Sequence, residues 1–305
     1  MSSLLLSPGM LWPAIVRRTA QALECGALCP IETVTTMVED GGVRFIVRQV
    51  SSLVRKAQKR GTRSAQPADP FLPYDPGLFV ADVSETHVAL LNKFNVIEHH
   101  LLIATRAFEE QEALLDIDDF TAWFACLAEF EGLGFYNGGV QAGASQRHKH
   151  MQIVPLPLNA ADTGSPSLPI EPLIRASGAP RSADVAVLAG LPFAHAFARL
   201  APASAPVAAH AALAAYLRLM NALGLGPAAS GDKPARQAAP YNLLLTPHWM
   251  LLVPRMAEHA QCISVNALGF AGSLFVRDCA QMETVRRIGP MTLLERVAMP
   301  RATKP

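Results

Sequence analysis

Cysteine, an excess of one charge and long hydrophobic runs are all scarce in this chain of 305 residues. Its five cysteines are odd in number and scattered, and only Cys25 and Cys29 lie close together. A structural zinc site needs a second ligand pair, which the sequence lacks. We therefore expect reduced thiols in a reducing compartment, and we interpret Cys25 and Cys29 as helix-packing residues.

The formal net charge is only +1, so no global field collects polyanions, and recognition of phosphate must come from local donors. No apolar run approaches the about eighteen residues of a membrane span. The first apolar run, residues 4–6, is too short for a secretory signal and has no basic stretch before it. These absences predict a cytoplasmic protein that does not span a membrane.

Half of the residues, 50%, are hydrophobic, so the chain can bury a large core as one domain or as two packed halves. One local charge excess stands out. Between Arg44 and Arg63 lie basic residues with no acidic residue among them. Such a run fits a solvated loop, an RNA-binding surface or a clamp for polyphosphate.

Periodicity predicts the elements of the first half. We expect a helix over 12–28, a hairpin of 33–37 with 43–50, and a helix that begins at Asp116 and ends before Gly132 and Gly134. An aromatic stripe on that second helix is interpreted as core. Strands are predicted at 79–83, 88–95, 100–104 and 135–140, followed by a strand that ends at Pro155.

The second half repeats this order. Loop-like segments at 159–184 and 226–240 flank a short strand near 193–200 and a helix over 206–223. A hairpin of 241–246 with 249–253, a strand with a glycine break over 263–276 and a helix over 291–299 follow. Trp249 and Leu251 stand where the first half has paired histidines, so this half is predicted to supply walls and no nucleophile.

The clearest chemistry lies in residues 135–157, FYNGGVQAGASQRHKHMQIVPLP. In an extended segment side chains alternate, so His148, His150 and Gln152 face one way and Lys149 faces the other. The small residues before them let a ligand approach backbone amides, which suits an anion and phosphate above all. Paired histidines alone also fit metal sites, pH-responsive surfaces or a satisfied core.

More of the chain resembles one family, the diadenosine tetraphosphate phosphorylases of the nucleotidyl-transferase branch of the histidine-triad superfamily. The resemblance covers residues 43–158 and 240–277. Its motifs are LLNKFNV (90–96), HHLLI (99–103), FYNGG (135–139), AGASQ (142–146), YNLLLT (241–246) and NALGFAG (266–272).

The resemblance implies an α+β fold of the histidine-triad type, an antiparallel sheet with flanking helices in two pseudo-repeated halves. The halves are expected at 1–158 and 185–305, with a linker at 159–184. The implied enzyme is a nucleotidyltransferase, an ATP adenylyltransferase that cleaves diadenosine tetraphosphate by phosphorolysis to ADP and ATP through an adenylyl-histidine. The expected partners are the dinucleotide and inorganic phosphate, and neither a nucleic acid nor a second subunit is expected.

In this reading His150 is the nucleophile, His148 orients the loop or the leaving group, and Gln152 donates to a phosphoryl oxygen. Gln152 cannot shuttle a proton, which favours phosphate over water as the acceptor. No protein-bound metal or covalent cofactor is implied, although Mg²⁺ is expected to accompany the polyphosphate. The implied substrate-binding residues are Lys56, Asn92, Lys93, Asn137, Gly143, Ala144, Ser145, Gln146, Gln152, Asn266, Ala267, Leu268, Ser273 and Arg277.

Some of these assignments have alternatives. Asn137 and Asn266 also suit turns. Ser273 and Arg277 stand where relatives have Met and Lys, and Arg alters the donor geometry at that position. Hexose-1-phosphate uridylyl transfer and adenylyl sulfate phosphorolysis are possible on the same scaffold, although Lys149 and the absent cysteine pairs argue against the uridylyl branch. A nucleotide-binding or RNA-binding module without turnover is the alternative of another class.

Overall fold

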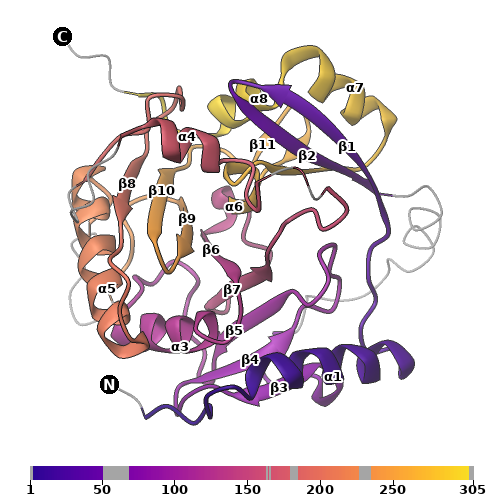
Figure 1. Cartoon of the computed structure of the whole chain (residues 1–305), viewed down its shortest axis with the longest axis vertical. Coiled ribbons are helices and arrows are strands. Elements are labelled where there is room, and N and C mark those ends of the chain that lie inside the picture. Colours follow the sequence, from indigo (N-terminus) through magenta and orange to yellow (C-terminus); the bar gives the residue numbers. More distant parts are fainter. Residues whose placement is uncertain are drawn as a thin grey trace.

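The computed structural model describes residues 3–50, 69–162, 164, 166–178, 185–226 and 235–301, arranged around one large sheet (Figure 1). Its eight strands follow one another in the order β3-β4-β5-β7-β6-β9-β10-β8, and every neighbouring pair is antiparallel. The strand bounds are β3 Phe79–Asp82, β4 His87–Leu91, β5 Leu101–Thr105, β6 Gly132–Gly138, β7 His150–Pro155, β8 Ala196–Arg199, β9 Tyr241–Thr246 and β10 Trp249–Pro254. The chain is therefore an α+β protein built on an antiparallel sheet, as predicted.

The two halves of the large sheet are built from the same order of strands and helix. In the first half the order along the chain is β5, α3 (Ile117–Leu127), β6 and β7, and in the second half it is β8, α5 (Ala205–Ala222), β9 and β10. The halves meet where β6 pairs with β9, and Asn137 lies opposite Asn242 there. Strands from both halves thus share one sheet, and the domain boundaries drawn at 158 and 185 stay a prediction.

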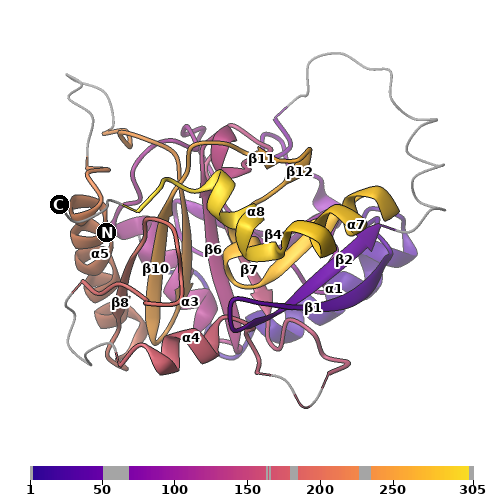
Figure 2. The same ribbon diagram turned by 90° about the horizontal axis from the view of Figure 1, so that it is seen from above.

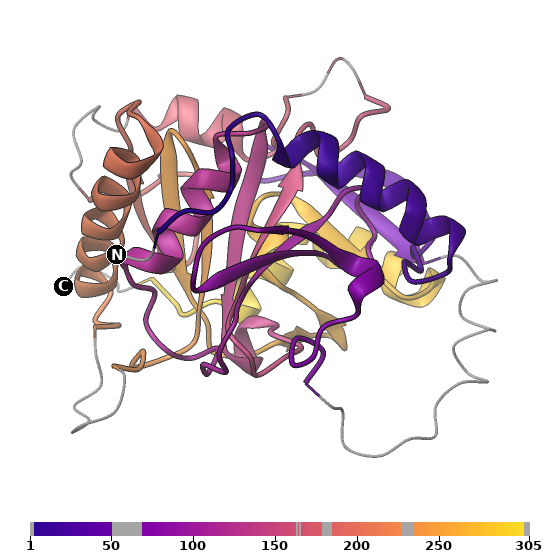
Figure 3. The same cartoon turned by 90° about the horizontal axis from the view of Figure 1, so that it is seen from below.

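One face of the sheet is covered by α3 and α5, which pack side by side, and α1 (Leu11–Glu24) lies against β3 (Figure 3). Helix α3 begins at Asp116, whose side chain accepts from the backbone of Asp119 while Asp119 caps in return, as in a capping box. The aromatic stripe of α3, with Phe120 and Trp123, is buried in the core on this face.

Helix α1 is shorter than predicted. It ends at Glu24, Cys25 occupies its C-cap, and Cys29 lies beyond it. Both thiols are exposed, so the packing role assigned to this pair was wrong. The apolar positions of α1 run out before Cys29, and Gly26 takes a positive φ of 75° that ends the helix.

A smaller sheet covers part of the other face, in the order β1-β2-β13 (Figure 2). Strands β1 (Thr33–Asp40) and β2 (Val43–Val50) form the predicted hairpin, and β13 (Ser273–Val276) pairs with β2 in parallel. Around it lie α4 Glu171–Ala176, α6 Ala267–Phe270, α7 Cys279–Ile288 and α8 Pro290–Val297. The small elements are η1 Pro76–Leu78, η2 Val140–Ala142, β11 His259–Ala260 and β12 Ile263–Ser264.

The strand with a glycine break predicted over 263–276 is wrong in its middle, where the structure has a helical turn. The segment divides into β12, α6 and β13, because Asn266 caps a helical turn by accepting from the amide of Leu268. Gly272, at a φ of 94°, then redirects the chain into β13. Among the described residues no helix is long and apolar enough to cross a membrane.

The basic run falls partly outside the described residues. Arg44 pairs with Asp162, and Arg48 is buried, where it donates to Ser273 and to the carbonyl of Leu158. These two arginines therefore hold the linker and β13 against β2. The rest of the run, with Lys56, lies outside the described residues.

Candidate active site

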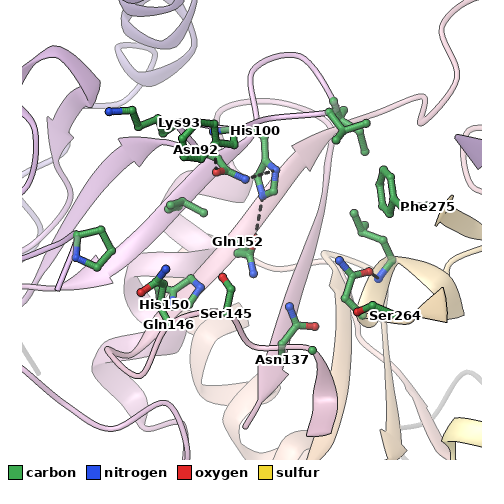
Figure 4. Close-up of a pocket in the computed structure, with 18 of the residues that line it drawn as sticks. Asn92, Lys93, His100, Asn137, Ser145, Gln146, His150, Gln152, Ser264 and Phe275 are labelled. Atoms are coloured by element: carbon green, nitrogen blue, oxygen red, sulfur yellow. Dashed lines mark hydrogen bonds between the residues drawn. The ribbon is translucent and has the colours of Figure 1, made fainter. Parts of the chain in front are cut away.

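A cavity of about 850 Å³ opens between the large sheet and the segment that carries β12, α6 and β13. Figure 4 shows its polar centre, with His150, Gln152, Ser145 and Asn137, between Lys93 on one side and Phe275 on the other. The structure brings most of the predicted site residues to its wall: Asn92, Lys93, Asn137, Gly143, Ser145, Gln146, His150, Gln152, Asn266, Leu268 and Arg277.

His150 opens β7, and its imidazole is held by the backbone. Its Nδ1 lies 2.8 Å from the carbonyl oxygen of His148, to which it donates. Burial lowers the pKa of His150 to about 4, although this backbone hydrogen bond opposes the shift. The ring is therefore neutral at pH 7, and the lone pair on Nε2 has no hydrogen-bond partner within the described part of the chain.

Gln111 fixes the backbone of the same residue. Its Oε1 accepts from the amide of His150 at 2.9 Å, and its Nε2 donates to the carbonyl oxygens of His150 and Asn137 at 3.2 and 3.0 Å. One buried amide thus satisfies both backbone groups of His150 and ties β7 to the end of β6. Gln111 was not among the predicted site residues.

Gln152 is oriented by a histidine that the prediction missed. His100 Nδ1 lies 3.0 Å from Asn92 Nδ2, and its Nε2 lies 2.9 Å from Gln152 Oε1 (Figure 4). Burial lowers the pKa of His100 to about 4, so the ring carries a single proton. Because Asn92 donates to Nδ1, that proton is on Nε2 and is donated to Gln152. The NH₂ group of Gln152 is thereby left as the donor on the cavity side.

The loop between β6 and β7 needs its glycines. Gly139 and Gly143 have positive φ angles of 94° and 88°, and a Cβ on Gly143 would lie 3.0 Å from Asn266. The amides of Gly143 and Ala144 already donate to the carbonyls of Val140 and Gly139. The amides of Ser145 and Gln146 have no acceptor among the described residues, so they are the donors that remain for an anion.

A polar network joins the halves beneath this loop. Asn137 Oδ1 accepts from Asn242 Nδ2 and from the amide of Ala267, both at 2.9 Å. Arg255, only 1% exposed, donates to Asn242 Oδ1 and to the carbonyls of Ala142 and Val265. The acceptor side of Asn137 is therefore used by the protein, and its NH₂ group is directed to the cavity (Figure 4).

Some predicted site residues do not line the cavity. Ala144 and Ala267 lie beside it, and the side chain of Ser273 is buried against Arg48, 2.5 Å from its Nη1. Asn266 lines the cavity, but its Oδ1 caps α6, as the turn interpretation allowed. Lys56 lies outside the described residues, so its assignment stays a prediction.

His148 is buried outside the cavity wall. Its Nδ1 lies 2.8 Å from Asp69 Oδ2, and its Nε2 lies 2.8 Å from the carbonyl oxygen of Thr105. Its backbone carbonyl, not its ring, contacts His150. The position of the His148 ring thus does not support a role in orienting the leaving group.

Lys149 faces away from the cavity, as alternation predicts, but it is not simple packing. Its Nζ lies 2.5 Å from Asp119 and 3.2 Å from Glu109, and Asp119 also contacts His87 at 3.0 Å. Burial would lower the pKa of Lys149, but the two carboxylates outweigh it and raise that pKa. The ion pair anchors β7 to α3 from behind.

Apolar side chains also line the cavity around its polar centre. They are Phe71, Tyr74, Leu90, Phe94 and Ile97 from the first half, and Val50, Phe275 and Val276 from the smaller sheet. This lining fits a ligand that carries flat apolar groups as well as an anionic part. Among the described residues no group of three or more His, Cys, Asp or Glu side chains is placed to hold a metal ion.

Two family models match the chain. The Ap4A phosphorylase N-terminal domain matches residues 1–176, and the ATP adenylyltransferase C-terminal domain matches residues 189–300. Two curated relatives from Saccharomyces cerevisiae are each 28% identical to it. They are diadenosine 5',5'''-P1,P4-tetraphosphate phosphorylase 2, over 272 residues and 79% of each chain, and protein APA1, over 286 residues and 84% of each chain.

Solved structures match the whole fold. The crystal structure of yeast Ap4A phosphorylase Apa2 superposes with a TM-score of 0.80 and 23% identity, covering 99% of this chain and 98% of the other. The structure of the same enzyme in complex with AMP gives a TM-score of 0.79 and 24% identity, covering 98% and 99%. The arrangement of the elements is therefore shared with these structures.

Proposed function

Because the chain belongs to the Ap4A phosphorylase family, we propose that it cleaves diadenosine tetraphosphate by phosphorolysis to ADP and ATP, and that His150 carries the adenylyl group. The observation that supports this most is the state of His150. A neutral, buried imidazole presents an unpartnered Nε2 to the cavity, between the amide of Gln152 and the loop of Ser145 and Gln146.

In the first half-reaction Nε2 of His150 attacks the α phosphorus of one adenylyl group. A P–N bond forms, the bond from that phosphorus to its bridging oxygen breaks, and ATP leaves with the electron pair. The NH₂ group of Gln152 donates to a phosphoryl oxygen and stabilises the negative charge that develops there. His100 holds Gln152 in that orientation. The proton stays on Nδ1, which donates to the carbonyl oxygen of His148, so Nε2 remains the nitrogen that attacks.

In the second half-reaction an oxygen of inorganic phosphate attacks the same phosphorus. The new P–O–P bond gives ADP, and the P–N bond breaks with its electron pair returned to Nε2. Phosphate arrives as an anion and needs no general base, whereas water profits from one, and Gln152 cannot serve as a base. The donors available for phosphate are the side chains and amides of Ser145 and Gln146.

Three further expectations belong to this proposal. Lys56 binds the polyphosphate as a compact cation. Mg²⁺ enters on the polyphosphate as part of the substrate, and the enzyme acts as a monomer.

The test is incubation with diadenosine tetraphosphate with and without inorganic phosphate, followed by chromatography. We expect ADP and ATP in equal amounts, only when phosphate is present, and AMP in trace. If AMP dominates the products in millimolar phosphate, the assignment as a phosphorylase is wrong and the protein is a hydrolase. Parallel incubations with adenylyl sulfate and a uridylyl sugar test the other transfers on this scaffold.

A further inference from the structure

His148, which is buried, pairs with Asp69, which is partly exposed, and the proposed mechanism does not use this pair. The two ring nitrogens of His148 face Asp69 Oδ2 and the carbonyl oxygen of Thr105, each at 2.8 Å. Nε2 of His148 also lies 2.9 Å from Thr105 Oγ1. The ring is thus held between Asp69 and Thr105, and its side chain is 1% exposed.

The second oxygen of the same carboxylate holds the next part of the cavity wall. Asp69 Oδ1 accepts from the amide of Phe71 at 2.9 Å. The Phe71 ring, 5% exposed, then packs on both histidines, with its centroid 5.4 Å from that of His148 and 5.2 Å from that of His150. One carboxylate therefore sets the position of Phe71 relative to the nucleophile.

We propose that the Asp69–His148 pair is a positioning clamp that seats Phe71 against His150 and so keeps water from the adenylyl-histidine. This inference rests on the proposed function for the intermediate, but its geometry does not. Without the cover, water enters the cavity beside His150, and its oxygen attacks the phosphorus in line with the P–N bond. A P–O bond then forms, the P–N bond breaks with its electron pair on Nε2, and AMP and one proton are released.

The substitutions Asp69→Asn and Phe71→Ala should both raise the ratio of AMP to ADP, by about tenfold, while ATP release falls less. The matched control is Asp82→Asn, because Asp82 is also a paired carboxylate, but its partner Arg106 does not line the cavity, whereas Phe71, which Asp69 holds, does. Asp82→Asn should keep the wild-type product ratio. Phe71→Leu retains an apolar cover, so it should lie between wild type and Phe71→Ala.

The double variant Asp69→Asn with Phe71→Ala separates the clamp from a general loss of structure. If the carboxylate acts through Phe71, the double variant should show no more AMP than Phe71→Ala alone. Additive increases, or a wild-type product ratio in Asp69→Asn, would overturn the proposal. Should Asp69→Asn not fold, a wild-type product ratio in Phe71→Ala would overturn it equally.

A second readout does not depend on the reaction. Diethyl pyrocarbonate modifies neutral imidazole, and trypsin separates His148 from His150 because Lys149 lies between them. In Asp69→Asn and Phe71→Ala we expect the modification rate of His150, followed by mass spectrometry, to rise at least about threefold over wild type and over Asp82→Asn. An unchanged rate would exclude the cover even in a protein that makes ADP and ATP, and a raised rate would support it even if the phosphorylase assignment failed.

Discussion

Strands β7 and β10 occupy equivalent places in the two halves, yet they present opposite chemistry on the same face of the sheet. When Val154-Pro155 is aligned with Val253-Pro254, Trp249 and Leu251 fall where β7 has His150 and Gln152. On β7 that face borders the cavity, whereas on β10 it is buried in an apolar core. One scaffold thus carries a site in one half and packing in the other, depending on which side chains fill the space.

Two histidines sharpen this contrast. His195 donates from Nδ1 to the carbonyl two residues before it at 2.8 Å, as His150 does. However, Nε2 of His195 accepts from the amide of Leu188 at 2.8 Å. The same local geometry therefore gives a satisfied core residue where a backbone amide is near, and, where a cavity is near, an Nε2 without a partner among the described residues.

The largest difference in turnover is expected between substitutions of His150 and of Trp249, its counterpart in β10. His150→Asn retains a donor for the carbonyl of His148 but removes the nucleophile, so turnover should fall by at least about 10⁴-fold. Nucleotide affinity, measured by calorimetry, should change only a few-fold. Trp249→Phe, the matched change in β10, should keep the rate within about twofold. A labelled adenylyl-enzyme in His150→Asn would contradict the assignment.

The junction between the halves should respond next. Arg255 is a buried cation that donates to backbone carbonyls and to the side-chain oxygen of Asn242. Arg255→Met therefore leaves several acceptors without donors. We expect the free energy of unfolding in urea to fall by about 3 kcal/mol. Arg175→Met, which breaks an exposed pair with Glu171, should change it by less than about 0.5 kcal/mol. If Arg255→Met and Arg175→Met lower the free energy of unfolding equally, the junction has no special role in stability.

A smaller change in chemistry is expected from Gln152→His. A histidine could protonate a leaving group and activate water, which the amide cannot do. Phosphorolysis should fall by about tenfold, and the AMP fraction should rise. Leu251→Met, the equivalent position of β10, should leave the products unchanged. If Gln152→His makes no more AMP than wild type, the amide is not what selects the acceptor.

The smallest effect is expected in the dependence of stability on pH. Burial lowers the pKa of His195 below its ordinary value near 6.5. As the pH falls below 6.5, this histidine therefore takes up a proton more readily in the unfolded chain than in the folded chain. Stability from this residue is present above pH 6.5 and is lost as the pH falls. His195→Gln should therefore reduce the loss of unfolding free energy between pH 7.5 and pH 5. ATP release at pH 7.5 should not change, which separates this histidine from His150.

Much of the fold followed from local pattern. Alternation placed His150 and Gln152 on one face and Lys149 on the other, because a strand has a period of two. The capping pair Asp116 and Asp119 fixed the start of α3. The prediction failed where local signals compete, as at residues 263–276, where the apolar pattern suggested a strand and the cap of Asn266 produced a helical turn.

The site could be predicted only in part. The residues that touch the cavity lie in recognisable motifs, but the residues that orient them are distant in sequence: His100 acts on Gln152 across 52 positions, and Asp69 acts on His148 across 79. No periodicity connects such pairs. Arg255 likewise reaches the loop of the other half only because β6 and β9 are neighbours in the sheet.

The sequence by itself determined the strands, the helix starts and the face on which the histidines lie, because these depend on the backbone period and on short-range hydrogen bonds. Tertiary structure alone decided which histidine presents Nε2 to the cavity, where we propose it as the nucleophile. The difference between His150 and His195 is the environment of one nitrogen, and that environment is set by packing between segments that are far apart in the chain.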